Sequence, residues 1–127
     1  MPLTTGGAQF LAKAWTGKNS PTLFSDSNFY IGVGDSATAF NVSQTDLVAA
    51  TNKYRKLVTS LVESSGVVTA LATFTTSEAN YEWVEWGTFN AGPSGGTMAG
   101  RKVENPTLGT KANTQVWSFQ ATITFGA

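Results

Sequence analysis

The chain has 127 residues and a mass of 13.4 kDa, which is enough for one domain with one ordinary hydrophobic core. Eight basic residues balance eight acidic ones, so the chain lacks the basic excess that is typical of nucleic-acid-binding proteins. Histidine and cysteine are absent, which excludes a Ser-His-Asp triad, a thiol nucleophile, a disulfide framework and a zinc site built on those ligands.

The first predicted element is a short helix over residues 8–15. Leu11 and Trp15 are four residues apart and share one face of that helix, and Gly17 follows as a stop signal. A helix of this length is not stable alone, so it must dock on something. We expect residues 2–15 to dock on a partner chain as an arm, with Gly6 and Gly7 decoupling its tip. The alternative is that Leu11 and Trp15 cap an open end of this domain.

Short apolar segments separated by glycine-containing turns predict strands at residues 28–34, 54–63, 67–76, 80–91, 97–104 and 117–125. Between the first two, Thr45 is predicted to cap a single helical turn. The last strand alternates strictly, and this pattern predicts that Trp117, Phe119, Ile123 and Phe125 face the core.

These elements predict an all-β fold: an antiparallel β-sandwich, jelly-roll-like, with a short N-terminal helix or arm. Residues 1–27 form the arm in this interpretation, and residues 28–127 form a single β-sandwich domain. No apolar run approaches the roughly 20 residues that a membrane-spanning helix needs, so we expect no membrane partner.

The carboxylates do not predict an active site. Glu82 and Glu85 lie three residues apart, which in a strand places them on opposite faces, so they do not form an acid–base pair across one bond. Asp26, Asp35 and Asp46 are scattered over loops and are only a weak calcium signal. We therefore expect no enzymatic activity, no cofactor and no metal.

Two groups of residues are candidates for binding a partner. Lys53, Arg55 and Lys56 form the one basic cluster, which is either a solvated strand edge or a set of ion-pair donors to an acidic partner. Trp83 and Trp86 fall on opposite strand faces. At least one is a core residue in this interpretation, and the other is an interface anchor or a stacking platform for a sugar or a base.

Several short motifs recur in a familiar order. They are Tyr-Ile-Gly-Val-Gly-Asp at 30–35, Thr-Asp-Leu at 45–47, the tryptophan-rich segment 78–91, Gly-Gly-Thr-Met at 95–98, Arg-Lys-Val at 101–103, Leu-Gly-Thr-Lys at 108–111 and the strand that begins at Trp117. Over about residues 28–125 this string resembles small virion structural proteins of tailed bacteriophages, and it is also similar to the N-terminal tail-collar domain of long phage tail fibres.

The resemblance implies a structural protein of the phage virion. The first hypothesis is a capsid cement (decoration) protein on the outer surface of the capsid, made in the host cytoplasm, with the major capsid protein and itself, as a homotrimer, for partners. A tail, collar or baseplate protein is the second hypothesis, and a carbohydrate-binding module is the third. The expected partner-binding residues are Leu3, Phe10, Leu11, Trp15, Arg55, Trp83 and Trp86.

Overall fold

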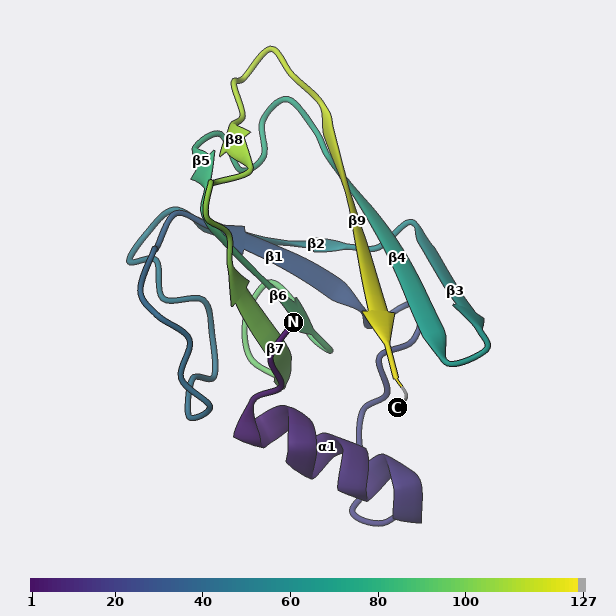
Figure 1. Ribbon diagram of the computed structural model, residues 1–127. Coiled ribbons are helices and arrows are strands. Elements are labelled where there is room, and N and C mark those ends of the chain that lie inside the picture. The colour runs from purple at the N-terminus through teal and green to yellow at the C-terminus, as the bar shows by residue number, and fades with distance from the viewer. Residues whose placement is uncertain (126–127) are drawn as a thin grey trace.

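The computed structural model describes residues 1–125, which form one helix followed by nine strands (Figure 1). The elements are α1 (Thr5–Thr16), β1 (Tyr30–Gly34), β2 (Lys53–Leu57), β3 (Ser60–Ser64), β4 (Val67–Phe74), β5 (Glu82–Trp83), β6 (Glu85–Phe89), β7 (Met98–Val103), β8 (Gly109–Thr110) and β9 (Trp117–Thr124).

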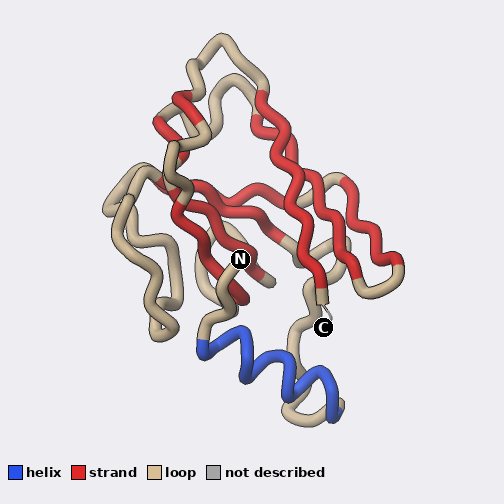
Figure 2. The backbone as a smooth tube through the Cα atoms, viewed as in Figure 1, coloured by secondary structure: helices blue, strands red, loops and turns tan. Residues whose placement is uncertain are grey.

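All the strand pairs are antiparallel, and they form two main sheets and one small one. The first sheet has the order β2-β1-β6-β7, the second has the order β3-β4-β9, and β5 pairs with β8 apart from both. Figure 2 shows α1 beneath one end of the strands and the long loop between β1 and β2 along one side. The prediction of an all-β sandwich with a short N-terminal helix is confirmed.

The main core lies between the two larger sheets. Its buried side chains come from β1, β4, β6 and β9 and from the segment around β5, and they alternate with outward-facing residues as the pleat requires. On β9, Ala121 is buried, whereas Trp117, Phe119 and Ile123 are half-buried against the core. Phe125 was predicted to face the core, but 51% of its surface is exposed because it follows the end of β9.

Two of the predicted strands are interrupted. The predicted strand 54–63 is split into β2 and β3, which belong to different sheets, because the chain crosses from one sheet to the other at Val58 and Thr59. The Val58 N–H donates to the carbonyl of Phe29, which directly precedes β1 of the first sheet. The Thr59 N–H donates to the carbonyl of Leu71 on β4 of the second sheet. The predicted strand 80–91 is likewise divided into β5 and β6, and at the break the Val84 N–H donates to the Gly34 carbonyl.

The N-terminal segment packs on its own domain. Leu3 bridges to Gly100 on β7, and the Thr4 side chain, almost fully buried, caps α1 by accepting a hydrogen bond from the Gly7 N–H. A side chain at Gly7 would collide with the backbone of Ala99, so this glycine permits close contact between helix and strand instead of decoupling the tip. For this part of the chain, the expectation of docking on a partner instead of its own domain is wrong.

Candidate functional site

A fully buried ion pair fixes the loop between β1 and β2 to the outer face of the first sheet. Glu85 on β6 and Arg101 on β7 are both inaccessible to solvent, and Arg101 Nε donates to Glu85 Oε2 over 2.6 Å. The same carboxylate accepts from the backbone N–H groups of Val48 (3.0 Å) and Ala49 (2.8 Å). These hydrogen bonds hold the backbone at Val48 and Ala49, and residues 45–50 form no helical turn, so the predicted turn capped by Thr45 is absent.

The basic cluster is engaged by acids of the same chain. Arg55 is almost fully buried and lies 3.6 Å from the centre of the Phe89 ring, with Asp46 as its ion-pair partner at 3.1 Å. Lys53 contacts the same carboxylate, also at 3.1 Å. Burial raises the pKa of Asp46, but the hydrogen bonds from Lys53 and Arg55 outweigh it and hold the pKa below its usual range. Arg55 is therefore not on a solvated edge.

Lys56, the third cation, belongs to a cluster around Glu78. Burial raises the pKa of Glu78, but a hydrogen bond from the Thr75 N–H and others from Lys56 and Tyr54 outweigh it. The net result is a pKa of about 2, compared with 4.5 for a free glutamate.

Acidification is expected to weaken the fold through Glu78. Because its folded-state pKa is depressed, its stabilising contribution is complete above about pH 5 and is lost as the pH falls toward 2. In Glu78→Gln, the decrease in the free energy of unfolding between pH 7 and pH 3 should be smaller than in the wild type. Denaturant unfolding at both pH values measures this, with Glu82→Gln, an exposed carboxylate outside the cluster, as the control. An equal decrease in wild type and Glu78→Gln would contradict the assignment.

Trp83 on β5 and Trp86 on β6 are both buried, at 2% and 7% exposure. Trp83 is surrounded by Phe74 at 4.8 Å and Trp117 at 5.0 Å between ring centres, and its indole N–H donates to the Ala79 carbonyl. These two tryptophans were predicted as partner-binding residues, and the structure places them mainly in the core. Part of their surroundings is accessible in a shallow depression that they share with β9.

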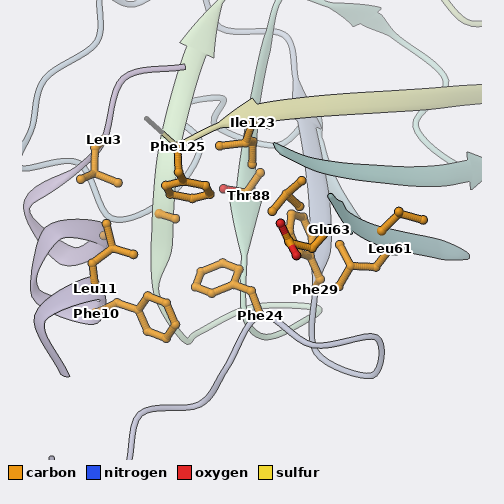
Figure 3. A pocket seen from close by; sticks show the side chains of 14 residues that line it. Leu3, Phe10, Leu11, Phe24, Phe29, Leu61, Glu63, Thr88, Ile123 and Phe125 are labelled. Carbon is orange, nitrogen blue, oxygen red and sulfur yellow. The ribbon is translucent and has the colours of Figure 1, made fainter. Parts of the chain in front are cut away.

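An apolar groove lies at the end of the sandwich that α1 covers (Figure 3). It encloses a cavity of about 210 Å³ between the helix and the open end of the inter-sheet core. Figure 3 shows side chains from α1, the following loop, β3 and the C-terminal end of β9 converging on this space. In the described part of the chain its lining includes Leu3, Phe10, Leu11, Phe24, Ile123 and Phe125, with Glu63 as the single charged residue.

The four predicted partner-binding residues of the N-terminal segment divide around this groove. Phe10 packs edge-on against Phe24 and helps to line the cavity, as do Leu3 and Leu11, which remain 42% and 38% exposed. Trp15 does not line the groove and is 92% exposed. The structure thus brings three of these residues together at one site and leaves Trp15 one helical turn beyond it.

The outer edge of β9 is the second unusual surface. β2, β3 and β7, the other edge strands of the two main sheets, all contain charged residues, and β7 is also bridged by Leu3. β9 is eight residues long and contains no charge, proline or glycine. Charges, prolines and bulges are the usual protection of an exposed edge against pairing with another strand. Within residues 1–125, the only strand paired with β9 is β4.

Sequence reasoning missed Arg101 and Glu85 as a pair, because residues 16 positions apart come together only through the β6–β7 pairing. It also missed the groove, since its walls come from six separate segments of the chain. The charge contrast between β9 and the other edges was readable from the sequence once the strands were assigned.

The described residues contain no helix that is both long and apolar enough to cross a bilayer. In comparisons with protein families, curated proteins and solved structures, no family model, no curated protein and no solved structure matched the chain.

Proposed function

We propose that the chain is a structural subunit of a bacteriophage virion, and specifically a capsid cement protein that binds the major capsid protein through the exposed edge of β9. The uncharged edge of β9 is the observation that carries this proposal. An extended segment of a neighbouring subunit can add to such an edge through main-chain hydrogen bonds, while side-chain pockets beside it give specificity.

The composition supports an assembly protein. With zero net charge and only 13% charged residues, the free chain has little electrostatic repulsion to oppose association between copies or with a partner. The ordered string of motifs from residue 30 to Trp117, which resembles small phage virion proteins, supports the virion as that assembly. By the same resemblance we propose a homotrimer on the outer surface of the capsid.

A tail, collar or baseplate protein remains the alternative within the same class, since the tail-collar domain of fibres has a similar string of motifs. The two roles differ in copy number, because a cement protein covers the whole capsid lattice and a tail protein occupies a few positions.

A second candidate function is carbohydrate binding, which one depression beside β9 favours. Its lining combines Trp117 and Phe119, both half-buried, with polar groups of Glu104, Ser118 and Gln120. Aromatic faces with polar groups at their edges suit a sugar ring. Binding on a glycan array that disappears in Trp117→Ala would support this function over the first.

The β9 edge is tested by placing lysines on its exposed face. Gln120→Lys with Thr122→Lys should leave the free energy of unfolding within about 1 kcal/mol of the wild type, because both positions are exposed. The same variant should lose binding to purified capsids that lack the protein. Ser60→Lys with Ser64→Lys places two lysines on β3, the opposite edge of the same sheet, and should still bind. Capsid binding by the β9 variant at wild-type affinity would contradict the proposal.

A further inference from the structure

The inter-sheet core is incompletely filled at the end that α1 covers. The cavity of about 210 Å³ continues the core past Phe29 and Ile123 toward solvent, and its wall is almost entirely apolar. A cavity of about 150 Å³ is enough to hold a benzene ring. The groove therefore has room for one aromatic side chain.

Trp15 is an aromatic side chain that is almost fully exposed to solvent. The other three tryptophans pack with Phe74, Phe119 or one another, whereas Trp15 is 92% exposed on the last turn of α1. At that exposure it presents on the order of 230 Å² to solvent. The helix that carries it is fixed to β7 by the Thr4 and Gly7 contacts, so the backbone at Trp15 has a defined position relative to the sheet.

The groove and the helix end are complementary in charge. Lys13 and Lys18 flank Trp15 in the sequence, and α1 contains no acidic residue. Among residues 1–125, Glu63 is the only charged residue that lines the groove, and it is exposed. A tryptophan that enters the groove from outside would bring positive charge toward this carboxylate.

We propose that Trp15 of one copy of this chain inserts into the α1-end groove of another copy. Trp15 does not line the groove of its own chain, and the ring sits one turn past Leu11, which does. Because knob and groove are different surfaces of one molecule, the contact is heterologous and repeats from copy to copy until the assembly closes. This association does not depend on the virion role.

The exposed apolar area is divided between the two copies in contact. Trp15 presents on the order of 230 Å² on one copy, and Leu3, Leu11, Val62 and Phe125 together present on the order of 300 Å² around the groove of the other. A standard interface buries roughly 800 Å² on each partner, of which about 56–65% is apolar. Each side thus supplies part of that apolar area, which fits a contact of smaller than standard size.

The mass of the purified full-length chain in solution tests the proposal. Light scattering and sedimentation across a concentration series should show an oligomer for the wild type. Trp15→Ala should weaken its association by at least about 30-fold, as expected for the loss of an interface hot spot. Leu108→Ala removes an apolar side chain of 42% exposure away from the groove and should associate as the wild type does.

Charge reversal tests the direction of the contact. Glu63→Lys should weaken association, and adding Lys13→Glu with Lys18→Glu to the same chain should restore it in part. Glu63→Gln keeps an oxygen to accept the hydrogen bond from the Gly66 N–H, so it separates the loss of charge from damage to the β3–β4 turn. Circular dichroism confirms that each variant is folded.

A monomeric wild type at every concentration would overturn the proposal, as would a Trp15→Ala variant that associates like the wild type. A monomer whose groove binds an apolar fluorescent probe such as anilinonaphthalene sulfonate would instead assign the groove to a small apolar ligand. Failure of capsid binding with self-association intact would remove the cement role and leave this inference standing.

Discussion

Replacing Arg101 with methionine is expected to lower the free energy of unfolding by about 3–5 kcal/mol, which is the usual cost of breaking a buried ion pair by removing one partner. The substitution leaves the Glu85 carboxylate uncompensated and inaccessible to solvent. A domain of this size has about 5–15 kcal/mol in total, so the variant should be close to unfolding.

Two variants of nearby carboxylates provide the comparison. Glu82→Gln changes an exposed residue three positions from Glu85 and should alter stability by less than about 0.5 kcal/mol. In Glu85→Gln, one of the two oxygens that accept from the Val48 and Ala49 N–H groups and from Arg101 becomes an NH₂ group. This variant should therefore be strongly destabilised. Guanidinium unfolding of the three variants measures these differences, and equal stability of Arg101→Met and Glu82→Gln would contradict the structure.

Replacing Trp83 with alanine should have a comparably large effect, about 3–5 kcal/mol, because it removes a large buried ring and leaves a cavity. Trp83 is 2% exposed and lies between Phe74 and Trp117, so little of that cavity can collapse without moving both sheets.

Trp15→Ala is the matched control, since the same chemical change is made at a side chain that is 92% exposed. At a concentration where the chain is monomeric, this variant should unfold at the wild-type denaturant midpoint. Similar losses of stability in the two variants would show that Trp83 is not a core residue, or that Trp15 packs within its own chain.

The sequence was sufficient for the elements that local periodicity specifies. The strict alternation of residues 117–125 predicted β9, and the spacing of Leu11 and Trp15 predicted α1, although the helix begins earlier, at Thr5, because Thr4 caps it. The fold class followed from the number and length of such segments. Each of these features depends on residues that are close in the chain.

Features that depend on contacts between distant segments were not predictable. Residues 54–63 contain no glycine or proline to mark a break, so the sequence gives no sign that the chain leaves one sheet for the other at Val58; that crossing is set by hydrogen bonds to Phe29 and Leu71. For the same reason, Thr45 is a plausible helix cap by local preference, yet Glu85 binds the following N–H groups and prevents the turn.

The candidate site divides in the same way. Residue type drew attention to Leu3, Phe10, Leu11 and Trp15, and three of them line the groove. Type alone could not separate Trp83 and Trp86, which the β4 and β9 side chains cover, from Trp15, which is 92% exposed. Burial of a tryptophan is decided by the strands opposite it, and a single sequence does not contain that pairing.

The copy number of this chain in purified particles of a phage that encodes it tests the central proposal most directly. Quantitative mass spectrometry of the virion, with the major capsid protein as the internal reference, gives the ratio of the two chains. A cement protein should be present at a ratio of the same order as the capsid protein, and it should be located on heads separated from tails. A few copies per particle, found with the tails, or absence from the virion would contradict a cement role.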